Sequence, residues 1–499
     1  MSKFIREIST LPVCLIPILL FLQPSSPSVI YVSPTPPTSC PGEPCYNLSY
    51  YASHGTEYLK SNTTMTFLPG NHEFKVQINV TNIESFSMIG SAATVVCKGS
   101  ECGGFLFENI SRLLIHSLTF ISDDNSITVE NLQEFVVMNC TFANNSNIAL
   151  VVKHTALFLE DNRFVNNSAQ SEVRNQPAPG GGIAIVSGNL TLMGQNEFVD
   201  NTCSDGLCGG SAIYALSSHV IVEGNTTLAN NSVMDNVGTG LPSGGGGVLF
   251  AGTTVDIRGQ MIFINNSVTN VYVKENTCEI AGGGASFIEC NVNISGQVLF
   301  SSNFAKGTSG CGGGLFLLGG TMIVTGHVKF SNNHAGFYGG GVFGKGTTVD
   351  IFGTALTISN IADQSGGGMK LANSSLHVAG DVICADNHAG PYYNDISEGG
   401  GWDIWYSTLN FTGTLTFSNN SADEAGGIAM IGTNMSATGN ITVTKNSAVE
   451  AGGGLLIGGS NVTISNIFVS DNSAQEGGGM VAQGGSVTVT ERASFKNNL

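Results

Sequence analysis

A cluster of two to four glycines recurs along the chain from residue 180 onward, at intervals as short as 25 to 27 residues. Repetition at a fixed period of this length indicates a repeat architecture, in which each unit packs mainly on its neighbours. The clusters begin at Gly180, Gly209, Gly244, Gly282, Gly312, Gly339, Gly366, Gly399, Gly426, Gly452 and Gly477.

Each repeat has the same internal order. The glycines precede a short apolar segment such as 315–317, then an alternating segment such as 348–351, then a third segment that ends in Phe-x-x-Asn, as in Phe330 and Asn333. Three short strands in about 25 residues, without helical periodicity, are typical of one coil of a parallel β-helix. The sequence therefore predicts an all-β fold, a right-handed single-stranded parallel β-helix (solenoid) with an N-terminal cap.

This pattern predicts a role for each repeated position. We expect the glycines to supply the positive φ of a tight corner, and the asparagine to occupy another corner where its amide bonds a stacked copy of itself. In the segment after the glycines, positions one and three should point inward, which places Trp402 in the core. Position two, occupied by Lys370 and Asp403, should face water.

The chain divides into four segments by composition. Residues 1–28 are typical of a secretory signal peptide, with Lys3 and Arg6 before a short apolar run; an uncleaved anchor is the alternative. Residues 29–66 are expected to form the cap, 67–179 irregular β-helix coils, and 180–499 the Gly-rich repeats. The last repeat is unfinished, which suggests truncation at the C-terminus, and no later apolar stretch is long enough to span a membrane.

The alternation of Gly-Gly-x with Phe-x-x-Asn over residues 140–499 resembles the polymorphic membrane protein repeats of bacterial surface autotransporters and related right-handed β-helix proteins. The resemblance implies a secreted, surface-exposed segment used in adhesion, located at the outer membrane if the protein is bacterial. The sequence departs from that family because it contains no C-terminal β-barrel of the autotransporter kind.

The net charge and the cysteines indicate which partners the chain can bind and in which compartment it folds. With 36 acidic and 18 basic residues the net charge is −18, so the chain cannot neutralise the phosphates of a nucleic acid. Three cysteine pairs share one spacing, which favours disulfides in an oxidising compartment over zinc sites. The predicted pairs are Cys40 with Cys45, Cys97 with Cys102, Cys203 with Cys208, and, across adjacent loops, Cys278 with Cys311.

Asn-x-Ser/Thr triplets are frequent and would accept glycans in a secreted eukaryotic protein. An Asn-, Ser- and Thr-rich chain also generates such triplets by chance. The candidate glycosylation residues are Asn47, Asn62, Asn225, Asn293, Asn410 and Asn461.

Nothing in the sequence predicts catalysis, a metal site or a cofactor. Convergent carboxylates, which a polysaccharide hydrolase requires, are not apparent. The long insertions all follow the corner asparagine, so they should form a ridge of corner loops along one side. In one of these regions four aromatic residues suit sugar stacking or a protein partner, unless they merely cover the loop: Tyr392, Tyr393, Trp405 and Tyr406.

The sequence therefore predicts a secreted or cell-surface, non-catalytic scaffold, adhesin-like, that binds glycan or protein partners through these loops. The alternative is a secreted carbohydrate-active enzyme, either a polysaccharide lyase or a glycoside hydrolase.

Overall fold

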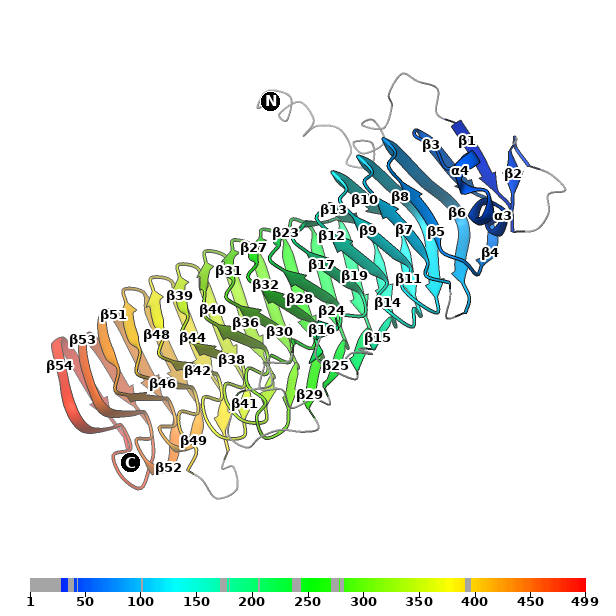
Figure 1. The fold of residues 1–499 in the computed structure, drawn as a ribbon. Helices are drawn as coiled ribbons and strands as arrows, with labels where there is room; N and C mark the ends of the chain where they lie inside the picture. The colour runs from blue at the N-terminus through cyan, green and yellow to red at the C-terminus, as the bar shows by residue number, and fades with distance from the viewer. Residues whose placement is uncertain are drawn as a thin grey trace, which may run out of the picture.

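The computed structural model describes residues 28–34, 40–42, 44–99, 102–170, 177–178, 180–204, 207–235, 244–270, 278, 282–390 and 396–499. These residues form a long stack of coils, with the N-terminal coils at one end and the C-terminal coils at the other (Figure 1). The predicted signal peptide lies outside the described residues, apart from Ser28.

One coil illustrates the architecture. Its strands pair in parallel with the equivalent strands of the next coil, in unbroken register. This arrangement confirms the predicted parallel β-helix, but each of these coils has four strands where the sequence predicts three. The coil consists of β34 (Leu315–Leu318), β35 (Thr321–Val324), β36 (His327–Ser331) and β37 (His334–Ala335), and the next of β38 (Val342–Lys345), β39 (Thr348–Ile351), β40 (Thr354–Ile358) and β41 (Ile361–Ala362).

The fourth strand begins directly after the corner asparagine and builds a separate ten-stranded parallel sheet. The sequence predicts loops at this position, and the structure corrects this because each insertion starts as a short strand. The members are β15 (Ser168–Gln170), β20 (Thr202–Ser204), β25 (Ser232–Asp235), β29 (Ser267–Asn270), β33 (Phe304–Lys306), β37, β41, β45 (His388–Ala389), β49 (Ser421–Glu424) and β52 (Ser447–Ala451).

The glycine clusters lie in one column, but positive φ explains only part of them. Gly312 has a φ of 68°, whereas Gly313 and Gly314 are not in the left-handed region. A Cβ on Gly313 would overlap the carbonyl oxygen of Gly340 in the next coil. The second and third glycines are therefore required by the close approach of stacked backbones rather than by a corner conformation.

The corner asparagines form a continuous ladder inside the stack. From Asn167 to Asn498 each Nδ2 donates to the Oδ1 of the asparagine one coil further on, at 2.8–3.0 Å. The left-handed conformation belongs to the residue just before, such as Asn332 with φ 55°. The Phe residues stack as expected, with ring centroids of Phe263, Phe300 and Phe330 separated by 4.5 and 4.8 Å.

The stack has two interiors. The main core fills the inside of the coils and contains Trp402, which is 1% exposed, as predicted. The second core lies between the first strand of each coil and the ten-stranded sheet, and position two of that first strand points into it. The prediction that position two faces water is therefore wrong, because the fourth strand covers it. The second core includes Ala184, Tyr214, Leu249, Phe316 and Phe343.

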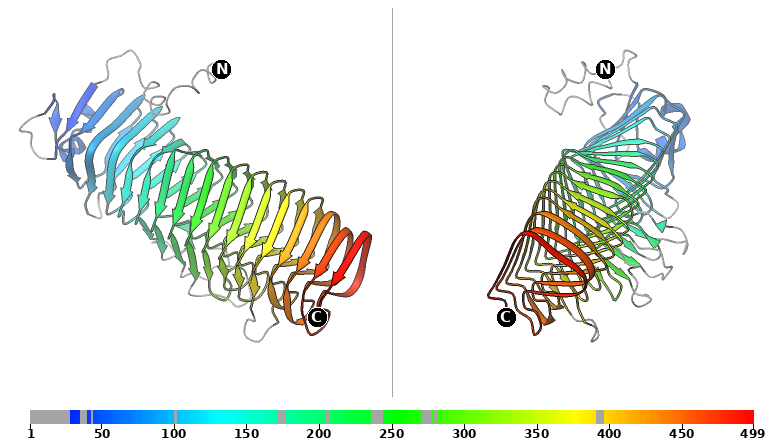
Figure 2. Two further views of the ribbon diagram at one scale, coloured as in Figure 1. Left: turned by 180° about the vertical axis from the view of Figure 1, so that it is seen from behind. Right: turned by 90° about the vertical axis from the view of Figure 1, so that its left-hand side faces the viewer.

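The N-terminal end is covered by two short helices, α3 (Leu48–Ser53) and α4 (Gly55–Tyr58) (Figure 1). Leu48 and Tyr51 of α3 are fully buried against the main core. The stack itself begins earlier, since β1 (Ser28–Val32) pairs in parallel with β3 (Thr63–Phe67). Figure 2 shows the coils nested behind one another when the stack is seen from the end.

Candidate functional site

Two of the four aromatic residues singled out in the sequence, Trp405 and Tyr406, lie at one corner of the stack. Trp405 ends β46 (Trp402–Trp405), and Tyr406 follows it in a left-handed conformation with 63% of its surface exposed. Their rings meet edge to face at 6.4 Å. Tyr392 and Tyr393 lie outside the described residues, so the structure brings together only two of the four.

The face of the Trp405 ring contacts the ammonium group of Lys370. Lys370 Nζ lies 4.1 Å from its centroid and 4.4 Å from the centroid of Tyr338. Cations attract aromatic faces most strongly when water is excluded. Trp405 is therefore part of a buried polar cluster, and Tyr406 is the exposed aromatic of the pair.

That cluster is built on a charged pair in the second core. Lys370 on β42 (Met369–Ala372) is the register partner of Asp403 on β46. Lys370 Nζ donates to Asp403 Oδ2 and, at 3.1 Å, to Ser365 Oγ. The side chains are only 5% and 0% exposed, and Asp403 Oδ1 has no hydrogen-bond partner in the described part of the chain.

Glu398 adds a second carboxyl group. Burial, and then the charge of Asp403, raises its pKa to about 7, although Lys370 and the indole N–H of Trp405 act in the opposite direction. Glu398 Oε2 and Trp405 Nε1 nevertheless do not meet hydrogen-bond geometry with any described group. The cluster thus holds an amine, two carboxyl groups and two aromatic rings beneath the corner.

Sequence reasoning missed this cluster because it assigned Lys370 and Asp403 to the solvent-facing side of their strand. A signal was nevertheless present. Both residues occupy the second place after a glycine triplet in consecutive repeats, and opposite charges at equivalent positions of neighbouring coils will face each other.

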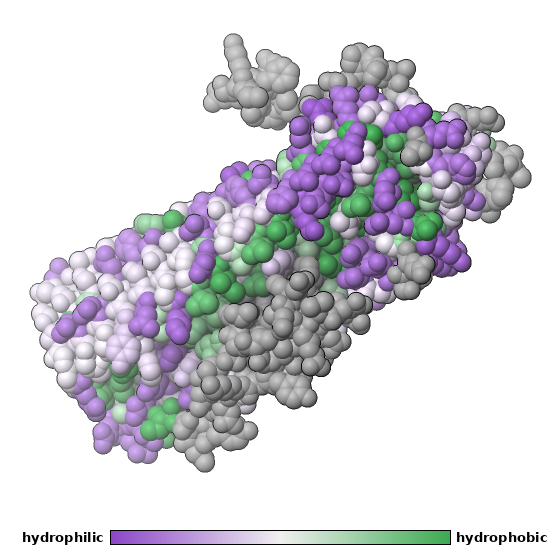
Figure 3. All heavy atoms as spheres, in the orientation of Figure 1, coloured by the Kyte–Doolittle hydropathy of each residue, from purple (hydrophilic) through white to green (hydrophobic). Residues whose placement is uncertain are grey.

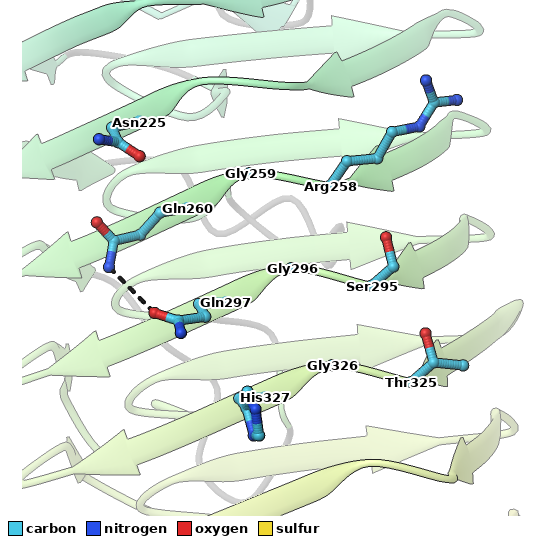
Figure 4. A pocket seen from close by; sticks show the side chains of 10 residues that line it. All are labelled: Asn225, Arg258, Gly259, Gln260, Ser295, Gly296, Gln297, Thr325, Gly326 and His327. Carbon is cyan, nitrogen blue, oxygen red and sulfur yellow. Dashed lines mark hydrogen bonds between the residues drawn. The ribbon is translucent and has the colours of Figure 1, made fainter.

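A shallow polar groove runs along the corner between the second and third strands (Figure 4). Its cavity volume is about 580 Å³. Gly259, Gly296 and Gly326 form its floor, and a Cβ on each would overlap a carbonyl oxygen of the preceding coil. Polar side chains flank this glycine line on both sides: Arg258, Ser295 and Thr325 on one, and Asn225, Gln260, Gln297 and His327 on the other.

The lining of this groove is nearly neutral. Its one permanent cation, Arg258, is paired with Glu223 at 3.2 Å and with Asp256 at 3.7 Å. Gln260 Nε2 donates to Gln297 Oε1 at 3.4 Å, which links two consecutive coils. The groove therefore offers amide and hydroxyl groups that repeat from coil to coil. The sequence pattern gave no indication of it.

On the face drawn in Figure 3, the C-terminal half is mostly of intermediate hydropathy, with hydrophilic and hydrophobic residues scattered over it.

Three of the four predicted disulfides are present among the described residues. Cys40 is bonded to Cys45, Cys97 to Cys102 and Cys278 to Cys311. Cys203 is also disulfide-bonded, while the side chain of Cys208 lies outside the described residues. Among the residues that the structure describes, three buried cysteines are free: Cys140, Cys290 and Cys384. Burial raises the pKa of Cys140 and of Cys384 to about 12, and it also raises the pKa of Cys290.

The candidate glycosylation residues lie near the surface, in contrast to the buried ladder asparagines. Asn62 is half-buried and accepts a hydrogen bond from Ser85 Oγ. The other five are exposed: Asn47, Asn225, Asn293, Asn410 and Asn461.

Within the described ranges, no group of three or more His, Cys, Asp and Glu residues is arranged to hold a metal ion. A search of the same residues finds no helix long and apolar enough to cross a membrane.

Comparison with known proteins adds little. No family model and no curated protein matches the chain, so the resemblance to polymorphic membrane protein repeats stays a prediction. Among solved structures, an alginate lyase of the PL6 family, AlyGC, matches over 94% of this chain and 100% of its own, with 9% identity and a TM-score of 0.14. Such a low score supports no argument about function, and the parallel β-helix is established by the strand pairings themselves.

Proposed function

We propose that this protein is a secreted or cell-surface, non-catalytic scaffold that binds a neutral, extended glycan along the polar corner groove. The observation that carries this proposal is the repeating row of amide and hydroxyl groups on either side of a glycine floor. Sugar hydroxyls pair with such groups, and side chains on stacked strands hold them in fixed positions with little loss of entropy.

The spacing of the coils suits a polymer. Neighbouring strands lie about 4.8 Å apart, so the groove presents one set of polar groups per coil in a straight row. A linear glycan can place successive sugar units over successive coils, and several weak contacts then add along one ligand. Tyr406, exposed at another corner, supplies a separate surface for sugar stacking.

The net charge of the chain favours neutral glycans over acidic ones. The chain carries a net charge of −18, which repels polyanions. Arg258 is occupied by two carboxylates, and it is not free to hold the uronate group on which a polysaccharide lyase acts. A neutral glycan is therefore favoured over an acidic one.

A glycan panel with the full chain tests this proposal. We expect binding to neutral, linear polysaccharides without new reducing ends or unsaturated products. The double variant Gln260→Ala/Gln297→Ala should weaken binding at least tenfold, whereas Asn291→Ala, an exposed amide on the second strand of the same coils, should leave it unchanged. Turnover of any glycan would overturn the proposal and favour the enzyme alternative, and binding that survives the double variant would exclude the groove.

A further inference from the structure

The Lys370–Asp403 pair places an amine against a carboxyl group where water has little access. The two residues are register partners on neighbouring coils, so backbone pairing alone fixes them side by side. In every other Lys or Arg ion pair of the described residues, each side chain is at least 22% exposed. The 5% and 0% exposure of this pair sets it apart.

The surroundings of the pair exclude water and satisfy its polar atoms only in part. Two aromatic rings face Lys370 Nζ, and Asp403 Oδ1 has no hydrogen-bond partner among the described residues. Burying two charges is costly, so converting the pair into a neutral product removes a desolvation penalty. Moving one proton along the existing Nζ–Oδ2 hydrogen bond yields a neutral amine, which is a nucleophile, and a carboxylic acid.

Glu398 provides a proton carrier beside the pair. Glu398 is the bridge partner of Ser365, whose Oγ accepts a hydrogen bond from Lys370 Nζ at 3.1 Å. Burial raises the pKa of the Glu398 carboxyl group to about 7, so this group can hold or release a proton near neutral pH. Its Oε2 has no hydrogen-bond partner among the residues described.

We propose that Lys370 and Asp403 condense into an intramolecular isopeptide bond, with Glu398 as the proton-transfer residue. Lys370 Nζ attacks Asp403 Cγ, a C–N bond forms, and one Cγ–O bond breaks. Glu398 delivers a proton to the departing oxygen, which leaves as water, and regains a proton from the nitrogen. The sum is one ammonium and one carboxylate converted into one amide and one water, with no oxidant or cofactor.

The fold supplies what this reaction requires. Groups held in a reactive geometry gain effective concentrations of roughly 10⁵–10⁸ M over free reactants. The amide also replaces two buried charges by a neutral group, and the exclusion of water opposes hydrolysis. The product is a covalent link between β42 and β46, and therefore between two neighbouring coils.

Proteolysis followed by mass spectrometry tests the bond on the full, folded chain, after reduction and removal of any N-linked glycans. Trypsin has no cleavage site between residues 346 and 445 except Lys370. We expect one fragment, 346–445, lighter than its sequence mass by one water. A glutamate-specific protease should then leave 346–398 and 399–424 joined, which a missed tryptic cleavage cannot produce.

The same digest contains an internal control. Lys98 pairs with Glu73 at 2.6 Å on neighbouring coils, but both side chains are 51% exposed, so cleavage at Lys98 should proceed without loss of water. Lys370→Arg should abolish the linked fragment, and Glu398→Gln should lower its yield at least tenfold while Glu398→Asp retains part of it. Unmodified fragments 346–370 and 371–445 from the wild-type chain would overturn the proposal outright, and a fully linked Glu398→Gln variant would remove Glu398 from it.

Discussion

The main core and the second core follow different rules although they share the same strands. The main core repeats the same chemistry from coil to coil, with stacked apolar residues throughout and the asparagine ladder from Asn167 onward. The second core changes along the stack, from Leu249 and Phe316 to the charged pair Lys370 and Asp403. The main core therefore defines the coil, and the second core can vary because only a two- to five-residue strand covers it.

Breaking the ladder should produce the largest effect. Asn333 is fully buried and makes four hydrogen bonds, with the amide and Nδ2 of Asn303, the carbonyl of Phe300 and the Oδ1 of Asn360. Since each buried group left unpaired costs about 1–3 kcal/mol, Asn333→Ala should lower the free energy of unfolding by about 5 kcal/mol. Denaturant unfolding measures this change.

The neighbouring asparagine provides the control. Asn332 is exposed in the left-handed conformation, so Asn332→Ala should cost only about 1–2 kcal/mol. If the two variants were equally destabilised, the ladder would not be the main support of the coil.

Removing one partner of the charged pair should come next. Asp403→Ala leaves Lys370 buried without its carboxylate and removes the proposed link, which should cost about 4 kcal/mol. The double variant Lys370→Met/Asp403→Leu should recover the part of this loss that comes from the unpaired ammonium group, because it restores the apolar character of the neighbouring coils. Thermal unfolding of the single and double variants tests the point, and a double variant as unstable as the single one would contradict it.

A direct comparison of the two interiors uses two phenylalanines. Phe300 stacks between two rings in the main core, whereas Phe316 stacks on Phe343 alone at 5.3 Å. We expect Phe300→Ala to cost about 4 kcal/mol and Phe316→Ala about 3 kcal/mol. The reverse order in denaturant unfolding would show that the second core carries as much of the stability as the main core.

The smallest effect concerns pH. The pKa of Glu398 in the folded protein, about 7, lies above its ordinary value of 4.5, so the folded state binds the extra proton. The stabilisation is complete below pH 4.5 and is lost as the pH rises through 7. The melting temperature should fall across this range, and Glu398→Gln should reduce the slope while Glu73→Gln, at an exposed site, should not. An unchanged slope in Glu398→Gln would contradict this account.

Much of the fold was predictable because it depends on residues that repeat in register. The positions of Phe330 and Asn333 within their repeat predict a stacked aromatic ring and a corner of the coil. The fourth strand was not predictable, because a two-residue segment such as β37 carries no recognisable pattern. Without that strand nothing covers Lys370, and a charged residue on an alternating strand is ordinarily solvent-facing.

The candidate sites were less predictable than the fold. Trp405 and Tyr406 stand out by residue type, but their surroundings depend on which coils stack together. The groove depends on Gly259 and Gly296 lying above one another, and these glycines are isolated in the sequence, outside the glycine clusters. Both the aromatic corner and the groove form because residues of different coils lie next to each other. Composition does not show which coils are neighbours.

The orientation of the asparagine amides has a consequence for how such a chain changes in length. From Asn167 to Asn472, each ladder asparagine donates from Nδ2 to the Oδ1 of the ladder asparagine in the next coil toward the C-terminus. Every corner therefore offers the same acceptor to the coil before it and the same donor to the coil after it. Excising one whole turn, for example the 27 residues between equivalent positions of β38 and β42, would rejoin matching ends and leave the amide row unbroken. Removing a fraction of a turn would instead set mismatched corners on top of each other, so this architecture can evolve by the gain and loss of complete modules.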